Sequence, residues 1–284
     1  MSKKTPTSDP DDPTPRLSKE ERKEVRERTA LRAVVVHEAI REEGEGELRR
    51  PASSLVWSGF AAGLSMGFSL VTMGLLQAHL PDEQWRPLIA NFGYTVGFLI
   101  VVLGRQQLFT ENTLTVILPL LAHRDLRTLF CVARLWTLVL LANLVGVLAF
   151  SWALGYTAVF DAETHRHFAA IARHVMEQDR FTMFVGAVFA GWLIAIMVWL
   201  LPSADNSRVG VVILMTYVVA LGGFAHIIAG SAEVIYLVVT GGATWGEYLL
   251  DFMLPTLAGN IIGGVALVAM VNHAQVAREA KMDR

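Results

Sequence analysis

Six long apolar segments follow one another between residues 54 and 271, and they constrain this chain more than any other feature of its sequence. The segments cover residues 54–78, 86–121, 128–156, 181–202, 209–240 and 245–271. A helix needs about 20 apolar residues to cross the hydrocarbon core of a bilayer, so each segment is long enough to do so. The sequence therefore predicts an all-α polytopic membrane protein with six transmembrane helices.

Charged residues gather ahead of these segments. Residues 1–50 hold 12 of the 24 Lys and Arg and 12 of the 26 Asp and Glu. We predict a charged N-terminal tail over this range, disordered at first and then helical from a capping-box pattern at Ser18 to about Glu43. This helix should pack on the bundle, with a membrane-surface anchor or a partner-binding helix as the alternatives. A transmembrane domain over residues 51–272 and a C-terminal tail over 273–284 complete the predicted organisation.

Neither the charge nor the cysteine content indicates another class of protein. The net charge of −2 gives no basic excess, so nucleic acid is not an expected partner, and the single cysteine, Cys131, excludes an internal disulfide. No nucleophile–base pair or cluster of metal ligands stands out, so we expect no catalysis, no cofactor and no metal. The His-rich stretch 157–180 is interpreted as a solvated cap, with a metal site as the alternative.

Two of the six segments are too long for a simple crossing and are polar in the middle. The second segment contains Arg105 and Asn112, and the fifth contains the Gly222-Gly223 pair and His226. Irregular backbone is tolerated at membrane depth only where it is buried in protein or lines a cavity. We therefore predict that helices 2 and 5 are broken and that the two breaks lie inside the protein.

The two halves of the apolar region share a pattern. Asn143 is followed three residues later by a glycine, and Asn260 repeats this at an offset of 117. Thr110 and His226, at the two predicted breaks, are 116 residues apart. Three crossings in each half make the second copy inverted in the membrane, which predicts an inverted 3+3 repeat with a permeation site at the midplane.

Lys and Arg accumulate on one predicted side of the membrane. If the N-terminus is cytoplasmic, the cytoplasmic side carries 19 of them and the opposite side 4. Because positively charged residues favour the cytoplasmic side, we expect cytoplasmic N- and C-termini. The chain would then be a multi-pass protein of the plasma (inner) membrane, in contact with membrane lipid.

His226 is the most informative single residue. An ionisable side chain inside an apolar segment indicates function by default, because its burial in hydrocarbon is costly. Imidazole can take or release a proton near physiological pH. The sequence therefore favours a functional His226 at the second break.

Three motifs resemble the signatures of the formate/nitrite transporter family. They occur in the family's order and on the corresponding segments, as Leu108-Phe109-Thr110, Gly223-Phe224-Ala225-His226 and Gly259-Asn260-Ile261-Ile262-Gly263-Gly264. The resemblance covers roughly residues 50–272. It implies an aquaporin-like fold assembled as a homopentamer, with one pore in each subunit.

The resemblance also implies which residues line the pore. The first break would present Thr110 to the central His226, and two apolar constrictions would bracket this pair. Their members, the outer three before the inner three, would be Tyr94, Leu108, Val219, Phe98, Phe109 and Ile194. Ordinary core packing is the alternative role of these six residues.

The chain departs from the family pattern at several positions, of which two are next to the first predicted break. Gln107 stands where an acidic residue is usual, and Arg105 lies where a small residue is expected. A charged side chain at mid-membrane costs about 2.5–3.5 kcal/mol on insertion scales, so it needs a partner or water. We expect Arg105 to pair with Glu111 or Glu233, or else to line a wet vestibule; these three are the predicted vestibule charges.

The sequence thus predicts a transmembrane channel or transporter, with residues 51–272 as its transport domain. Its substrates would be small monovalent anions, formate- or nitrite-like, or their conjugate acids. Desolvation of a bare anion in an apolar constriction costs much free energy. His226 would lower that cost as a proton donor or electrostatically. The alternatives are a pore for another weak acid or a neutral small solute, and a membrane-embedded interaction or sensor protein that uses the charged tail.

Overall fold

The computed structural model of the chain describes residues 18, 20–21, 31–271 and 274–276. The chain divides into two compact units, residues 1–32 and 33–284. In the first unit, the Glu21 N–H donates to the Ser18 hydroxyl at 3.1 Å and the Ser18 N–H donates to the Glu21 carboxylate at 2.7 Å. These are the two bonds of the predicted capping box. The predicted disordered stretch before Ser18 lies outside the described residues.

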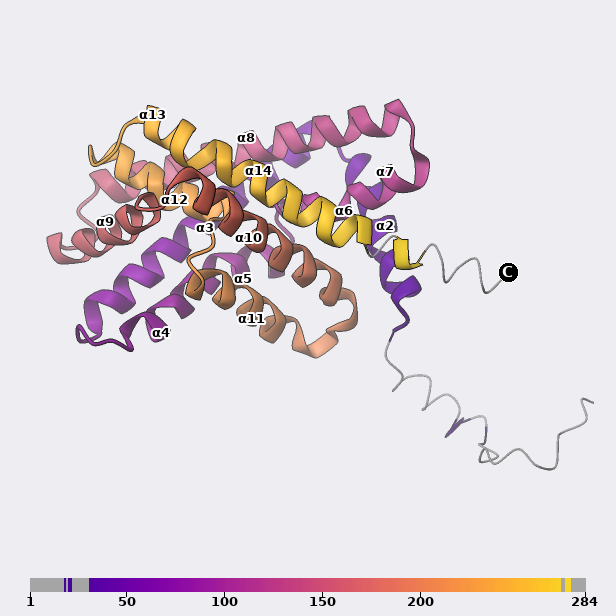
Figure 1. The fold of residues 1–284 in the computed structure, drawn as a ribbon, viewed down its shortest axis with the longest axis horizontal. Helices are drawn as coiled ribbons and strands as arrows, with labels where there is room; N and C mark the ends of the chain where they lie inside the picture. Colours follow the sequence, from indigo (N-terminus) through magenta and orange to yellow (C-terminus); the bar gives the residue numbers. More distant parts are fainter. Residues whose placement is uncertain (1–17, 19, 22–30, 272–273, 277–284) are drawn as a thin grey trace, which may run out of the picture. The chain divides into compact units, whose positions relative to one another are not determined.

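The second unit is a bundle whose regular elements, in the part of the chain that is described, are all helical (Figure 1). Five helical stretches are long and apolar enough to cross a membrane, and they cover residues 52–79, 86–103, 126–156, 180–203 and 245–266. They comprise α3 (Ala52–His79), α4 (Arg86–Ala90), η1 (Asn91–Tyr94), α5 (Thr95–Leu103), α8 (Leu126–Tyr156), α10 (Arg180–Leu200), η2 (Leu201–Ser203), α13 (Trp245–Glu247), η4 (Tyr248–Met253), α14 (Leu254–Ile262) and the start of η5 (Gly263–Met270).

The shorter helices flank two stretches in which the chain leaves the helical conformation. The first stretch, residues 104–111, lies between α5 and the pair α6 (Asn112–Thr115) and α7 (Ile117–His123). The second, residues 222–226, separates α11 (Arg208–Leu221) from α12 (Ile227–Val239). The remaining elements are α2 (Ala33–Leu48), α9 (Ala162–Met176) and the short turn η3 (Asp205–Ser207).

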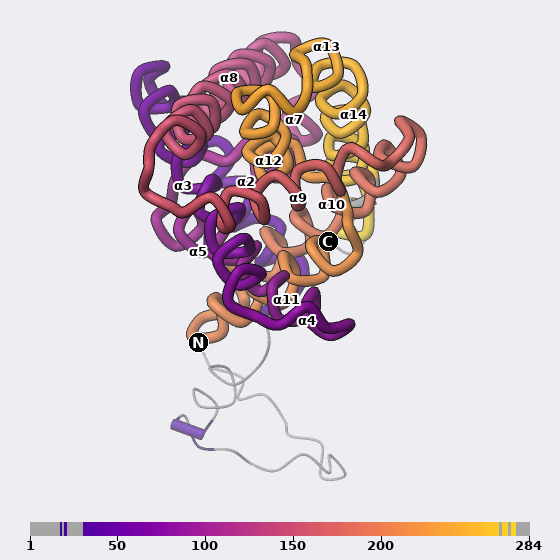
Figure 2. Tube along the Cα trace, turned by 90° about the vertical axis from the view of Figure 1, so that its left-hand side faces the viewer, coloured from indigo at the N-terminus to yellow at the C-terminus, as the bar shows by residue number. Residues whose placement is uncertain are grey.

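Helix α12 forms the centre of the unit. Its residues from Ile227 to Val238 are all buried, and it packs against α3, α8, α9, η4 and α14 (Figure 2). A helix that is buried on every side is apolar all round, as α12 is apart from Ser231, Glu233 and Tyr236. The second non-helical stretch therefore delivers its residues to the middle of the bundle.

Two glycines let the surrounding helices approach closely. A Cβ on Gly63 of α3 would overlap with the Asn143 carbonyl oxygen of α8, and a Cβ on Gly191 of α10 would overlap with the Asn260 carbonyl oxygen of α14. Small residues at helix interfaces allow such backbone contact. The pairs α3–α8 and α10–α14 are thus packed in the same way.

Aspartates outside the apolar core start the long helices α8 and α10. The Thr128 N–H donates to the Asp125 carboxylate at 2.9 Å, and the Thr182 hydroxyl donates to that of Asp179 at 2.6 Å. These bonds favour the charged carboxylates and lower the pKa of both aspartates. Each side chain satisfies N–H groups that the first helical turn leaves without a partner.

Helix α2 continues past the predicted end at Glu43 and runs through Gly44 and Gly46 to Leu48. A Cβ on Gly44 would overlap with the Thr115 carbonyl oxygen, so this glycine serves the close packing of α2 on α6 and α7. It does not stop the helix. The sequence pattern alone could not distinguish a packing glycine from a terminating one.

Candidate functional site

The first non-helical stretch begins at a left-handed cap on α5. Arg105 has a φ of 52°, its N–H donates to the Val102 oxygen at 3.2 Å, and the Gln106 N–H donates to the Val101 oxygen at 3.0 Å. This arrangement satisfies the last carbonyl groups of a helix and usually places glycine at the left-handed position. An arginine there carries a conformational cost of about 1–2 kcal/mol.

The second non-helical stretch begins with the same cap on α11. Gly223 has a φ of 61°, its N–H donates to the Ala220 oxygen at 3.1 Å, and the Phe224 N–H donates to the Val219 oxygen at 3.0 Å. Glycine adopts this conformation without a Cβ clash. Arg105 and Gly223 therefore occupy matching positions, 118 residues apart.

One buried asparagine holds each stretch. Asn143 accepts a hydrogen bond from the Phe109 N–H at 3.0 Å and donates to the Gln107 oxygen at 2.9 Å and the Gly59 oxygen at 2.7 Å. These bonds replace the helical ones that the non-helical backbone lacks.

Asn260 does the same for the second stretch. It accepts from the Ile227 N–H at 2.8 Å and donates to the Ala225 oxygen at 3.0 Å and the Ala187 oxygen at 2.8 Å. Both asparagines, singled out by their shared motif, thus fasten an irregular backbone segment to a long helix.

The two stretches meet through Thr110 and His226. The Thr110 hydroxyl lies 2.8 Å from the His226 Nε2 atom, and both residues are almost completely buried. His226 also caps α12, because its Nδ1 atom accepts from the N–H groups of Ile228 at 3.3 Å and Ala229 at 3.2 Å. These two donors assign the ring proton to Nε2, which then donates to the Thr110 hydroxyl.

Apolar side chains surround this pair. All six predicted constriction residues are buried: Tyr94, Phe98, Leu108, Phe109, Ile194 and Val219. The Phe98 ring lies 5.0 Å from the His226 ring in an edge-on arrangement, and the Tyr94 ring lies 5.3 Å from that of Phe98. The His226 ring thus contacts the Phe98 ring, and all six residues belong to one buried apolar cluster.

Sequence reasoning missed Trp136 of α8. Its ring lies 5.7 Å from the Phe109 ring, and its indole N–H donates to the Asn112 oxygen at 3.1 Å. Asn112 in turn donates to the Gln107 side chain at 3.1 Å. A tryptophan in the middle of an apolar segment was the available signal, because its N–H must find a partner when buried.

Two cavities lie next to these residues. The first, which we call the α9-side cavity, has a volume of about 270 Å³ and is lined by Tyr94, Val219, His226 and Glu233 together with residues of α9. The second, the α2-side cavity, has a volume of about 410 Å³, and α2, Arg105 and Glu111 contribute to its lining. His226 lines the first cavity and Glu111, next to Thr110, lines the second. Thr110, which lines neither cavity, thus bonds a residue of the first lining and precedes a residue of the second.

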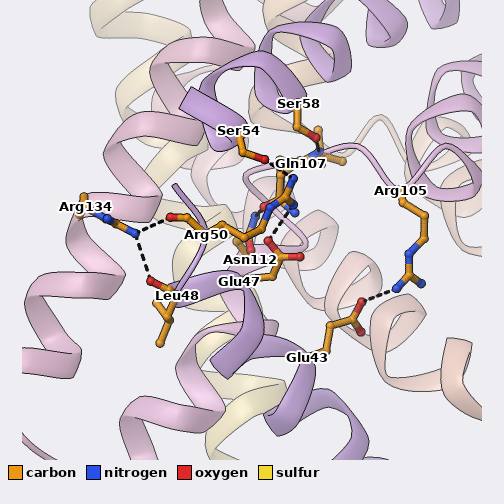
Figure 3. Close-up of polar contacts among 11 residues, drawn as sticks. Glu43, Glu47, Leu48, Arg50, Ser54, Ser58, Arg105, Gln107, Asn112 and Arg134 are labelled. Carbon is orange, nitrogen blue, oxygen red and sulfur yellow. Dashed lines mark hydrogen bonds and ion pairs between the residues drawn. The ribbon is translucent and has the colours of Figure 1, made fainter. Parts of the chain in front are cut away.

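Arg105 pairs with Glu43 of α2, at 3.2 Å, and not with Glu111 or Glu233 (Figure 3). Arg105 and Glu111 line the same α2-side cavity, whereas Glu233 lines the α9-side cavity. The three predicted vestibule charges are thus divided between two sites. The sequence could not reveal the partner, because Glu43 lies 62 residues away on a helix whose docking is a tertiary feature.

A polar network fixes the end of α2 beside the first stretch (Figure 3). Arg134 of α8 donates to the Leu48 and Arg50 carbonyl oxygens, both at 3.1 Å. Arg50 pairs with Glu47 at 2.9 Å and donates to the Ser54 hydroxyl at 3.0 Å. These contacts connect α2, α3 and α8, and Glu47 of the network also lines the α2-side cavity.

The His-rich stretch forms helix α9, and one of its histidines bonds within the protein. The His165 Nδ1 atom lies 2.8 Å from the Tyr236 hydroxyl. Among the residues that the structure describes, no group of three or more His, Cys, Asp or Glu side chains could hold a metal ion.

The apolar helices and the enclosed polar pair define a polytopic transmembrane transport protein. The chain belongs to the formate/nitrite transporter family, because residues 34–274 match the model of the family described as "Formate/nitrite transporter". It is 44% identical over 258 residues to "Inner membrane protein YfdC" of Escherichia coli (strain K12), covering 91% of this chain and 83% of that protein. It is 26% identical over 250 residues to "Formate channel BtFdhC" of Bacillus thuringiensis, covering 84% and 93%.

Two solved structures share the fold. A "Pentameric formate channel with formate bound" aligns with a TM-score of 0.66 and 21% identity, covering 78% of this chain and 95% of that one. An "FNT family ion channel" aligns with a TM-score of 0.70 and 17% identity, covering 84% and 98%. These two structures show that the chain shares its fold with solved channels.

Proposed function

We propose that the chain forms a transmembrane pore for small monovalent anions of the formate or nitrite type, or for their conjugate acids. The observation that carries this proposal is the buried Thr110–His226 pair: His226 lines the α9-side cavity, and Thr110 directly precedes Glu111, which lines the α2-side cavity. The relationship to a formate channel of B. thuringiensis supports the same substrate class. The route runs from one cavity to the other past this pair.

The pore is built from six crossings in an inverted 3+3 repeat, with helices 2 and 5 broken at residues 104–111 and 222–226. Three matching features support this architecture: the left-handed caps at Arg105 and Gly223, the glycine contacts, and the bonds of Asn143 and Asn260. The fold is aquaporin-like. A homopentamer is the assembly we propose, because the formate channel that shares the fold is pentameric.

The protein is oriented with both termini in the cytoplasm of a cell whose plasma (inner) membrane it spans. The distribution of Lys and Arg supports this orientation, and the similarity to an inner membrane protein of E. coli supports the choice of membrane. The α2-side cavity then opens to the cytoplasm and the α9-side cavity to the outside. The apolar flanks of the bundle face lipid and neighbouring subunits.

His226 and Thr110 act as hydrogen-bonding groups at the narrowest point. The Thr110 hydroxyl accepts the His226 Nε2–H, and its own O–H has no acceptor among the described residues, so that O–H is available to a permeating oxygen atom. A small acid that loses its hydration shell needs such a donor, because burial of an unpaired polar group is costly. A proton relay through the ring is the alternative; a second proton on Nδ1 would displace the bonds to Ile228 and Ala229.

The test is uptake by proteoliposomes that contain the purified protein. Formate, nitrite and acetate are compared with a neutral solute of similar size from about pH 5 to 8, the range in which histidine titrates. Uptake of the anions without the neutral solute supports the proposal. Uptake of the neutral solute alone supports the alternative pore, and no uptake by any assembled sample favours an interaction or sensor protein.

A further inference from the structure

Glu233 is a buried carboxyl on the same helix as His226. Its side chain is 5% exposed, and it lies seven residues after His226 and three after Gly230. Residues at these spacings share one face of a helix. All three line the α9-side cavity, so the carboxyl and the imidazole face the same space.

No described side chain or backbone group forms a hydrogen bond or ion pair with the Glu233 carboxyl. The other ionisable side chains that line the cavity are Tyr94, His174 and His226. No Lys or Arg is among the lining residues of this cavity. A carboxyl that is buried without a cation or a donor is rare in proteins, because its charged form loses hydration without compensation.

The elements η4 and α9, which pack against α12, bring few ionisable groups to this space. Tyr248 of η4 bonds the Ser231 hydroxyl at 3.0 Å, and His165 of α9 bonds the Tyr236 hydroxyl at 2.8 Å. Among the ionisable residues of α9, His174 alone lines the cavity. Neither element therefore places a permanent cation at the cavity wall.

The other helices packed against α12 are poor in ionisable residues near Glu233. Helix α14 has none, and α3 has none before its last residue, His79. Helix α8 has ionisable residues only near its start and at Tyr156, which donates to the Val239 oxygen at 2.9 Å. Gln77, Asn91 and Gln178 also line the cavity, but none of them bonds the Glu233 carboxyl, which leaves the approaching substrate or water as its partner.

A charged Glu233 would obstruct the proposed substrate. Two negative charges about 4 Å apart at an effective dielectric constant near 20 reduce occupancy by roughly a thousandfold. A neutral Glu233 has the opposite effect, because its O–H group can donate to the oxygen of an arriving anion. The buried carboxyl therefore suits a permeating species that exchanges a proton with it.

We propose that Glu233 is a proton-exchange site for the permeating weak acid in the α9-side cavity. This inference rests on the proposed function and specifies that the species that reaches His226 is the neutral acid. The O–H bond of the Glu233 carboxyl breaks while an O–H bond forms on the substrate oxygen. Glu233 is left as a carboxylate and regains its proton from water in the cavity, and no oxidation or reduction occurs.

The α2-side cavity holds a different set of charges. Glu111 lines it without a hydrogen-bond partner at its Oε1 atom, but Arg105 and Arg208 line the same cavity. Glu43 and Glu47 line it too, and Glu43 pairs with Arg105, so the two arginines supply permanent cations that partly offset three carboxyl groups. The absence of such cations among the lining residues of the α9-side cavity assigns the exchange to Glu233.

The experiment compares wild type with Glu233→Gln, which keeps the size of the side chain and removes its exchangeable acid. Uptake of formate and acetate is measured in proteoliposomes from about pH 4 to 8, with an internal pH dye that reports accompanying proton entry. We expect Glu233→Gln to reduce uptake below neutral pH by at least about tenfold, since a positioned proton donor contributes roughly 10²–10⁴-fold. The remaining uptake should follow the concentration of the neutral acid in solution.

Two further variants serve as controls. Glu163→Gln makes the same substitution at an exposed position on α9 and should leave the uptake profile unchanged. Glu233→Asp keeps the acid and moves it by one methylene group, so pH-dependent uptake should persist with a shifted midpoint. If Glu233→Gln does not assemble, Glu233→Asp provides the test in its place. An uptake profile of Glu233→Asp that superimposes on that of wild type then overturns the proposal.

The opposite outcomes are distinct. Higher uptake by Glu233→Gln at every pH would make the carboxyl a simple electrostatic barrier and overturn the exchange. An unchanged profile would overturn it as well, with the proposed function intact. A lack of uptake by assembled wild type would defeat the proposed function, and this inference with it.

Discussion

The two non-helical stretches, residues 104–111 and 222–226, have the same backbone frame and different side chains. Each follows a helix that ends in a left-handed cap, and each is held by one buried asparagine. The first frame presents Thr110, whereas the second presents His226 as the cap of α12. At the offset of 118 that matches the two caps, His226 matches Leu108 and not Thr110, so the two similar frames bring unlike groups into contact from different positions.

The two stretches also differ in the backbone strain at their left-handed positions. Gly223 occupies its left-handed position freely, but Arg105 occupies the matching position against its preference. Strained backbone persists only when the surroundings fix it; here the two cap hydrogen bonds hold the backbone, and the exposed Glu43 carboxylate also pairs with the side chain. The second frame has no comparable charge at this point.

The largest expected effect comes from removing the asparagines that hold the two frames. Asn143→Ala and Asn260→Ala each delete three hydrogen bonds and leave buried groups unsatisfied, at about 1–3 kcal/mol for each group. We expect the free energy of unfolding to fall by several kcal/mol in both variants, to a similar degree. Most of the assembled protein should be lost in each. Size-exclusion chromatography and thermal unfolding measure this, with exposed Asn206→Ala as the control. Tolerance of one variant and not of the other would show that the frames are not equivalent.

The second effect is on transport, because it concerns the groups that differ between the frames. His226→Asn keeps a residue that caps helices well, so the start of α12 should survive while the ring is lost. Thr110→Val removes the hydroxyl, and Thr110→Ser retains it. We expect the first two to change uptake or anion selectivity by at least about tenfold, equivalent to about 1.4 kcal/mol, and Thr110→Ser to resemble wild type. Superimposable profiles for assembled His226→Asn would reduce the histidine to a structural cap.

The third effect tests the two left-handed positions. Gly223→Ala adds a Cβ to a backbone with positive φ and should destabilise the protein by about 1–2 kcal/mol. Arg105→Gly removes the same conflict, so it should stabilise the protein, by less than about 1 kcal/mol. Thermal unfolding of matched samples provides the measurement. Equal losses from both changes would mean that the side chain of Arg105 outweighs its backbone strain.

The smallest effect concerns the ion pair that only the first frame has. Both partners are largely exposed, at 71% for Arg105 and 46% for Glu43, so solvent screens the interaction. Glu43→Gln should cost at most about 1 kcal/mol, and the loss should disappear at high salt. The neighbouring exposed Glu42→Gln is the control. A loss that persists at high salt would show that Glu43 acts through packing.

Several features of the site were predictable because they follow from local chemistry. Asn143 and Asn260 are polar residues in apolar segments, so each had to find partners, and each bonds a non-helical backbone segment. His226 was identified for the same reason. The Thr110–His226 contact was expected from the family resemblance, and the two side chains lie within hydrogen-bonding distance.

Other features depend on distant parts of the chain and were not predictable. Glu43 pairs with Arg105 only because α2 docks on α6 and α7, and Gly44 is a packing residue for the same reason. The division of Glu111 and Glu233 between two cavities likewise requires coordinates. A sequence pattern shows which polar groups need partners, but the chain offers many possible partners for each of them.

The sequence by itself determined that the chain spans a membrane, since long apolar runs have few other stable solutions, and it determined which buried polar residues must matter. Only the tertiary structure decided which groups satisfy one another. Asn143, Thr110 and Arg105 each have partners from distant parts of the chain, because close packing of the helices sets which groups lie within bonding distance. The apolar sequence determines which segments form membrane-spanning helices, whereas their close packing determines which residues are in contact.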